Sequence, residues 1–186
     1  MTDFLRSRRY GEGLINLNNG HTPRSPGGVW GKRTEYGEMR KLIEAVSRCL
    51  QGFPVKITEG AKEPYGDDLV IIFHKGTTEK NGMSGGADIT VPENASARTQ
   101  YNAYRLLCTL CNEMGLRYRG VHTATEKSPF ISLRHTENEN AFLIRVGFID
   151  CDRDNALCDG EPDSTAAALS KEIIRIYKEK INENYS

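Results

Sequence analysis

Two histidines and one glutamate have the residue types and positions expected of a metal site. His21 follows a short apolar segment, His74 ends a long apolar run, and Glu35 opens an amphipathic segment. Two neutral imidazoles and one carboxylate around a cation, with a fourth position open, make up the ligand set of a catalytic zinc site. The spacing is long and irregular, so no compact motif such as H-E-x-x-H adds to this interpretation. The hypothesis is that the fold brings these three side chains together.

Each of these residues also has an ordinary structural interpretation. A histidine at a strand end is commonly a hydrogen-bonded structural residue, and a glutamate in a first helical turn commonly caps the helix or interacts with its dipole. The metal hypothesis therefore depends on all three residues sharing one place. Glu38 lies on the adjacent edge of the same helical face and is an alternative ligand. His122 and His135 lie near predicted strand ends, where surface or structural roles are favoured.

The cysteines favour packing over chemistry. Cys108 and Cys111 form a C-x-x-C pair, but both fall on or beside the inward stripe of a predicted helix, and free cysteine is among the most buried residue types. Five cysteines is an odd number, and no apolar run follows the basic N-terminus to make a secretory signal. We therefore expect the chain to be made in the cytoplasm without a signal peptide, with its thiols reduced.

Alternating strands and helices must position these residues. Apolar patterning predicts strands at 13–17, 53–58, 67–74, 87–91, 130–133 and 141–148, and helices at 35–50, 94–114 and 165–181. This alternation predicts an α/β fold with a twisted, mostly parallel sheet flanked by helices on both faces. Open α/β sheets bind ligands beyond the carboxyl ends of their strands, which is where His21 and His74 are expected.

Length and charge limit the classes of function. A chain of 186 residues fits one domain, with a polar, basic lead-in at 1–12 and the domain at 13–186. Lys+Arg and Asp+Glu both number 25, so a formal net charge of zero gives no general attraction to nucleic acid or anionic membranes. No segment approaches the roughly 20 apolar residues of a membrane span. We therefore expect no nucleic-acid partner and no membrane insertion, and the oligomeric state is left open.

The order of these motifs resembles a known family, the zinc-dependent N-acetylmuramoyl-L-alanine amidases found in bacterial autolysins and phage endolysins. The matching segments are 14–17 with Gly20–His21, Thr34–Tyr36, 68–74, Arg119–Gly120, 131–134 and 142–150. The resemblance spans residues 13 to 181, nearly the whole chain. It implies the same fold class, a single amidase-like catalytic domain at 13–186.

The resemblance also implies an activity and a cofactor. In that family two histidines and a glutamate bind zinc, which by resemblance would be His21, Glu35 and His74 here. The implied reaction is hydrolysis, by a zinc-activated water, of the amide between the lactyl group of muramic acid and L-alanine. The implied partner is peptidoglycan, and the implied place of action is the cell wall after release of the protein, as for an endolysin. The residues that bind the substrate are not indicated.

One departure from the family pattern concerns catalysis. The family carries its catalytic glutamate in the late apolar strand, and this sequence has Arg145 at that position. A guanidinium is always charged and cannot act as a general base. Arg145 could stabilise an oxyanion, pair with Glu35 and weaken metal binding, or repel the cation. The candidates for a substitute base are Glu38, His135, Glu137 and Glu139.

Arg145 therefore leaves two hypotheses of different class. The first is a zinc amidase whose proton-transfer step is impaired, for which Arg145→Glu is expected to raise activity. The second is an inactive protein of the amidase fold that binds muropeptide or a protein partner. Retention of His21, Glu35 and His74 favours the enzyme, because a pure binder does not need all three. A weaker alternative is a metal hydrolase of some other amide.

Overall fold

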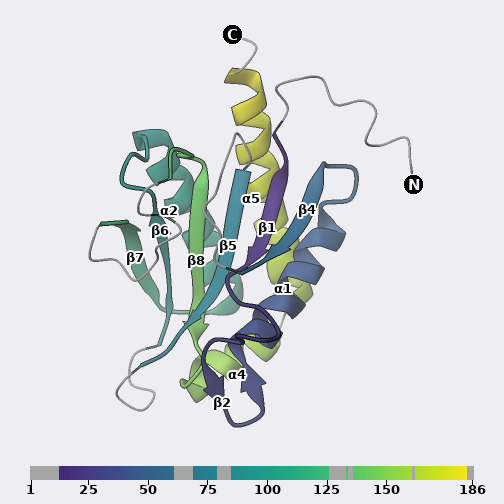
Figure 1. Ribbon diagram of the computed structural model, residues 1–186, viewed down its shortest axis with the longest axis vertical. Helices are drawn as coiled ribbons and strands as arrows, with labels where there is room; N and C mark the ends of the chain where they lie inside the picture. Colours follow the sequence, from purple (N-terminus) through teal and green to yellow (C-terminus); the bar gives the residue numbers. More distant parts are fainter. Residues whose placement is uncertain are drawn as a thin grey trace.

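A computed structural model of the chain describes residues 13–60, 69–78, 85–125, 133, 136–160 and 162–183. The predicted lead-in at 1–12 and His135 lie outside these residues. Figure 1 shows a twisted sheet with helices packed against it. Within the described ranges, no helix is both long and apolar enough to cross a membrane.

The main sheet has six strands in the order β4-β1-β5-β8-β6-β7. Their bounds are β1 Ile15–Asn19, β4 Val55–Glu59, β5 Leu69–Gly76, β6 Ala87–Val91, β7 Tyr118–Thr123 and β8 Ala141–Phe148. Neighbouring strands pair in parallel, except that β6 and β8 are antiparallel. The prediction of an α/β fold with a mostly parallel sheet is confirmed.

The two central strands are the two continuous apolar runs of the sequence. β5 pairs with β8 in a register that places Val70 beside Ala141 and His74 beside Arg145. Phe73 of β5 is fully buried, as is most of β8. Apolar runs without alternation suit strands that are covered on both faces. The strands predicted at 87–91 and 141–148 are confirmed in full, and the strand predicted at 67–74 is confirmed from Leu69 onward.

Three long helices pack on one face of the sheet. They are α1 Glu35–Cys49, α2 Ala97–Met114 and α5 Pro162–Glu183, and Figure 1 shows α1 and α5 running behind the strands. The hydroxyl of Thr34 accepts the N–H of Gly37 at the start of α1, and Ser96 caps α2 in the same way. The apolar faces of the three helices form one core with Leu69, Ile71 and Phe73 of β5.

The opposite face of the sheet carries a second, smaller apolar cluster. Val70, Ile72 and Leu143 lie there with Ala124 and Leu133. Leu133 is helical, so the strand predicted at 130–133 is wrong at that residue, while 130–132 lie outside the described part of the chain. A helical residue thus lies on the face that α1, α2 and α5 leave uncovered, which agrees with the prediction that helices flank both faces.

Three strands and one helix were not predicted from the sequence. A hairpin of β2 Val29–Trp30 and β3 Arg33–Thr34 lies partly within the predicted loop at 18–31. β7 is a largely exposed edge strand, and α4, Asp152–Gly160, lacks a clear apolar stripe. Figure 1 places α4 and the hairpin together at one end of the sheet, and the Arg33 guanidinium joins them by an ion pair with Asp159.

This end of the sheet is where the strands bring the candidate ligands together. β1 and β5 are parallel neighbours whose last paired residues are Asn19 and Phe73. His21 lies two residues beyond the end of β1, and His74 follows Phe73 in β5. The amino-terminal turn of α1 reaches the same edge, because the backbone N–H of Glu35 donates to the carbonyl of Gly28. Strand ends and a helix start therefore meet at the edge of the sheet where open α/β folds bind their ligands.

Candidate metal centre

His21, Glu35 and His74 converge into one group, as predicted. One oxygen of the Glu35 carboxylate, Oε2, lies 3.1 Å from Nε2 of His21, and the other, Oε1, lies 2.8 Å from Nδ1 of His74. The two imidazole rings meet edge to face with their centroids 4.9 Å apart. One ligand atom from each residue lies within 4.8 Å of the others. This arrangement can hold a metal ion with two nitrogen ligands and one oxygen ligand.

Two glycines make room for the imidazole rings. A Cβ atom on Gly20 would overlap the ring of His74. A Cβ atom on Gly27 would lie 2.5 Å from Nε2 of His21 and 2.6 Å from Oε2 of Glu35, and Gly27 also has a φ of +73°. Both positions therefore need a residue without a side chain, and Gly27 needs glycine for its backbone as well.

Backbone donors fix the position of the Glu35 carboxylate. The N–H of Lys75 donates to Oε1 at 2.8 Å, and the N–H of Gly28 donates to Oε2 at 3.1 Å. Glu35 is only 3% exposed. Burial alone would raise the pKa of Glu35, but its hydrogen bonds with His21 and His74 outweigh burial and lower that pKa to about 2. The carboxylate is therefore ionised and already oriented toward the two histidines.

Asn19, the last residue of β1, links this strand to the segments that carry the metal ligands. Its side chain is buried, its carbonyl oxygen accepts the backbone N–H of His21 at 3.2 Å, and its amide donates to the carbonyl of Tyr36 at 2.9 Å. Asn19 thus joins the segment that carries His21 to the helix that carries Glu35. Groups of this kind orient metal ligands in proteins.

The alternative ligand Glu38 is not part of this group. Its carboxylate pairs with Arg33 at 2.9 Å and Lys41 at 3.2 Å, and the side chain lines a separate pocket with Lys75 and Cys158. These ion pairs also make it a poor substitute base.

The other candidate bases lie elsewhere. Glu139 comes just before β8, next to Asn140, whose carbonyl accepts the N–H of Val70 at the beginning of β5. His74 lies at the other end of that strand. Glu137 is on the same side as Glu139, with its carbonyl bonded to Asn94. The structure therefore brings neither glutamate to the metal group.

The remaining predictions about side chains are largely confirmed. Cys111 of α2 is buried in the main core, and no disulfide links any of the five cysteines, all of which lie in the described residues. His122 is exposed on β7.

Arg145 has a partner that sequence reasoning missed. Its guanidinium bonds the Asp88 carboxylate through Nε at 3.0 Å and Nη2 at 2.9 Å. Asp88 is fully buried in β6, directly opposite Arg145 in the antiparallel pair. The hydrogen bonds of Glu35 go instead to the two histidines and two backbone amides. The suggested pairing of Arg145 with Glu35 is therefore replaced by a pairing with Asp88.

The missed residues had weak local signals. Asp88 is an acidic residue inside a short, buried strand, and a buried carboxylate needs a cationic or hydrogen-bonding partner. Gly27 and Gly28 belong to a segment whose glycines and prolines indicated only a loop. Their contacts with His21 and Glu35 depend on how the loop folds back, which local patterning does not specify.

Comparison with solved structures identifies the fold. The chain resembles the N-acetylmuramoyl-L-alanine amidase from Clostridium difficile 630, with 15% identity, a TM-score of 0.69, and 88% of this chain and 96% of that one covered. It resembles the catalytic domain of the amidase CwlV from Bacillus (Paenibacillus) polymyxa var. colistinus, with 16% identity, a TM-score of 0.71, and 89% and 98% covered.

A third similar structure is the catalytic domain of the CD27L endolysin, which targets Clostridia difficile. It has 15% identity, a TM-score of 0.60, and 88% and 97% of the two chains covered. By sequence, no family model matches the chain, and a search of curated proteins gives no match. At these identities the likeness establishes that the chain has the fold of amidase catalytic domains.

Proposed function

We propose that this protein is a metal-dependent peptidoglycan hydrolase that cleaves the amide between the lactyl group of muramic acid and L-alanine, with zinc as its cofactor. The observation that carries the proposal is the group of His21, Glu35 and His74, at the carboxyl edge of an amidase-type sheet. The resemblance of the sequence motifs and the likeness of the fold to amidase catalytic domains both support it.

The donor set fits zinc. Two imidazole nitrogens and one carboxylate oxygen are the ligand types that zinc takes in hydrolases, with a further position left for water or substrate. The ligand atoms lie close enough to surround one ion, and the glycine positions keep the space open around the rings. Zinc held there would supply Lewis-acid polarisation of a carbonyl and an activated water at neutral pH.

The residues of the chain hold and orient the site. Glu35 is fixed by the N–H groups of Gly28 and Lys75, so its carboxylate needs little rearrangement to act as a ligand. Asn19 fixes the backbone of His21. Such preorganisation reduces the entropy lost when a ligand binds, and outer groups of this kind commonly change metal affinity by 10- to 100-fold.

Proton transfer is the step for which the described residues are poorly equipped. Arg145 stands where the family carries its glutamate, and the nearest carboxylate on the adjacent strand, Asp88, is bonded to Arg145. General base catalysis is typically worth about 10² to 10⁴ in rate. We therefore expect slow amidase activity compared with a protein that has the glutamate.

The same observation favours a second candidate function, the binding of muropeptide without cleavage. A site whose described residues supply metal ligands but no base can retain its ligand while turning it over very slowly. Peptidoglycan is the partner in both cases, and the cell wall is then the place of action.

Digestion of purified cell walls separates the two candidates. The zinc-loaded protein should release stem peptides that begin with L-alanine, and His74→Ala should release none. Exposed new amino termini can be counted by labelling and identified by mass spectrometry. Retention on the walls without release, in both proteins, would favour the binding function and contradict the amidase.

A further inference from the structure

We propose that Arg119 and Arg145 form a subsite that binds a carboxylate of the substrate beside the metal centre. The proposal rests on the proposed function, in that the ligand is the peptide stem of peptidoglycan. The carboxylate in question is the one on the α-carbon of the second stem residue, on the leaving side of the cleaved amide.

Arg119, Arg145 and Asp88 form a charged cluster, and the burial of each side chain decides which charge faces solvent. The Asp88 side chain is 1% exposed, whereas those of Arg145 and Arg119 are 25% and 31% exposed. Arg119 Nε lies 3.5 Å from Asp88 Oδ2, and Arg145 Nη2 lies 2.8 Å from the same oxygen. Among the described residues, this cluster sets two exposed cations against one buried anion, which gives it a positive charge at the surface. Such a surface attracts an anion rather than a metal ion.

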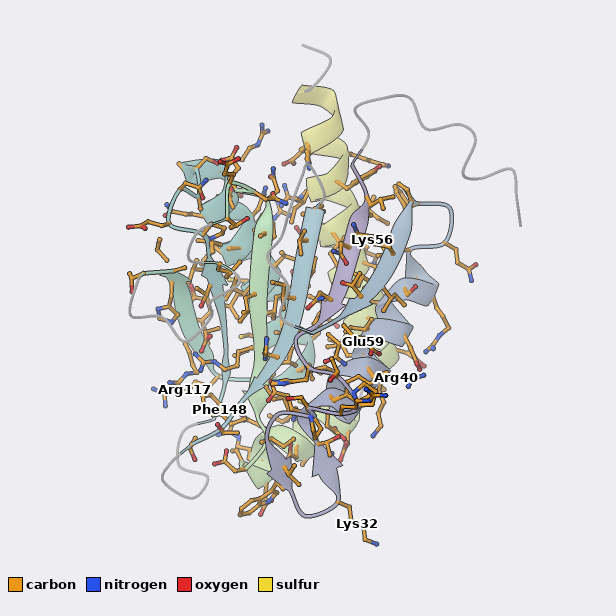
Figure 2. The ribbon with its side chains drawn as sticks, viewed as in Figure 1. Lys32, Arg40, Lys56, Glu59, Arg117 and Phe148 are labelled. Carbon is orange, nitrogen blue, oxygen red and sulfur yellow. The ribbon has the colours of Figure 1, made fainter. Side chains whose placement is uncertain are left out.

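The two guanidinium groups are held in place by a shared aromatic ring. The ring centroid of Phe148 lies 4.9 Å from the Arg119 guanidinium carbon and 5.3 Å from that of Arg145. Figure 2 shows Phe148 at the end of β8, near α4 and the hairpin. Cation–π contacts and the anchor to Asp88 limit the motion of both side chains. Groups that are already fixed lose less entropy when they bind a ligand.

The cluster adjoins the metal group. His74, Arg145 and Asp88 occupy neighbouring register positions on β5, β8 and β6, and strands in a sheet lie about 4.8 Å apart. The stem of Arg145 also runs over Gly76, where a Cβ atom would lie 2.9 Å from its Cδ. The residue before Gly76 is Lys75, whose N–H bonds Glu35. The positive surface therefore begins within one or two strand spacings of the metal ligands.

The dimensions of the substrate match this separation. In an extended peptide stem, the α-carboxylate of the second residue lies about 7 Å from the scissile carbonyl, from Cα spacings of about 3.8 Å. One to two strand spacings cover the same range. A stem whose scissile carbonyl lies at the metal group can thus place its second-residue carboxylate against Arg119 and Arg145. Arginine suits this role, because its planar donors match a carboxylate.

The test compares two ligands that differ in one group. These are N-acetylmuramoyl-L-alanyl-D-isoglutamate, with a free α-carboxylate, and N-acetylmuramoyl-L-alanyl-D-isoglutamine, with a carboxamide there. Affinities for the full chain are measured by calorimetry with chelator present, so that neither ligand is cleaved. We expect the carboxylate ligand to bind about tenfold more tightly, the value of one charge-assisted hydrogen bond.

Three variants test whether Arg119 and Arg145 cause the preference for the carboxylate ligand. Arg119→Gln and Arg145→Gln should each bring the ratio of the two affinities close to one. Arg105→Gln is the matched control, because Arg105 also pairs with a carboxylate, that of Glu172, but on the helix face. Its ratio should equal that of the native protein. If Arg145→Gln does not fold, Arg119→Gln still decides the test, since Asp88 then keeps its bonds from Arg145.

The outcomes separate this proposal from the proposed function. Equal affinities for both ligands in the native protein, or a preference that survives Arg119→Gln, would overturn the subsite. A clear preference lost in both variants, in a protein that neither holds zinc nor cleaves walls, would support the subsite and contradict the hydrolase. Cleavage of walls without any preference would contradict the subsite alone.

Discussion

Individual residues decide whether the candidate metal centre can form, and Gly27 is the one with the least tolerance. Its position demands both a positive φ and the absence of a side chain beside His21 and Glu35. The two requirements have different origins, one in the backbone and one in the site. A comparison with a glycine that has only the first requirement can separate them.

Gly27→Ala should weaken zinc binding at least about tenfold, because the new methyl group would press on two ligands that must stay in position. Gly31→Ala is the matched control, since Gly31 has a φ of +60° but no atom within 4 Å of its added Cβ. Both variants should lose about 1 kcal/mol of stability from the backbone strain. Competition titration with a zinc chelator measures the affinities. Equal zinc affinity in the two variants would contradict the role given to Gly27.

Arg145 and Asp88 have to be changed together to restore a base. Arg145→Glu alone should lower the free energy of unfolding by about 2 kcal/mol, since it leaves buried Asp88 facing a second carboxylate. Adding Asp88→Asn removes that repulsion. We expect the double variant to hydrolyse cell walls at least about tenfold faster than the native protein.

Asp88→Asn alone controls for the loss of the buried charge and should bring no gain in rate. Thermal unfolding and the wall-digestion rate provide the two readouts. A native protein that digests walls rapidly and loses this activity in the double variant would show that Arg145 itself assists the reaction.

At the scale of elements, one glutamate makes part of the polar contact between α2 and α5. Glu172 accepts two hydrogen bonds from Arg105 on α2, at 3.1 and 2.8 Å, and one from Arg175 on its own helix, at 3.0 Å. Burial raises the pKa of Glu172, but the two arginines outweigh it and hold that pKa below its ordinary value of 4.5. The ionised carboxylate therefore ties the two helices together.

Glu172→Gln should lower the free energy of unfolding by about 1 kcal/mol at pH 7. Because the folded-state pKa is depressed, this stabilisation is present above the unfolded-state pKa and disappears as the pH falls through the folded value. The difference between variant and native protein should therefore shrink as the pH falls below 4.5, and vanish once the carboxylate is protonated in the folded protein. Urea unfolding at several pH values measures it. Glu44→Gln, which breaks an exposed pair with Arg40, should have little effect at any pH.

The elements that the sequence predicts well are those with a strong periodic or continuous apolar pattern. β5, β8 and α1 were predicted for that reason, and with them came His74, Arg145 and Glu35. β7 was missed because its outer position leaves it polar, and α4 because Asp154 and Asn155 bind backbone groups rather than adding to an apolar stripe. The pairing of Asp88 with Arg145 joins residues far apart in the chain, and only the register of β6 on β8 reveals it.

For the molecule as a whole, the reactivity of the five cysteines shows whether the chain folds with free thiols or with disulfides. Cys49 is exposed and Cys111 and Cys151 are buried, and burial raises the pKa of the Cys111 thiol to about 11. In the native protein we expect Cys49 to react with an alkylating agent first and Cys111 to react slowly. Unfolding without reductant should then expose five reactive thiols by mass spectrometry. Fewer than five in most molecules would contradict the structure.

The central claim is that His21, Glu35 and His74 together hold one zinc ion, and metal content measures it most directly. The native protein and His74→Ala are loaded with zinc, passed through a desalting column and assayed for zinc per chain. Two remaining ligands rarely hold zinc against water, so we predict one zinc per chain in the native protein and close to none in His74→Ala. No bound zinc in the native protein, or equal zinc in both proteins, would contradict the account.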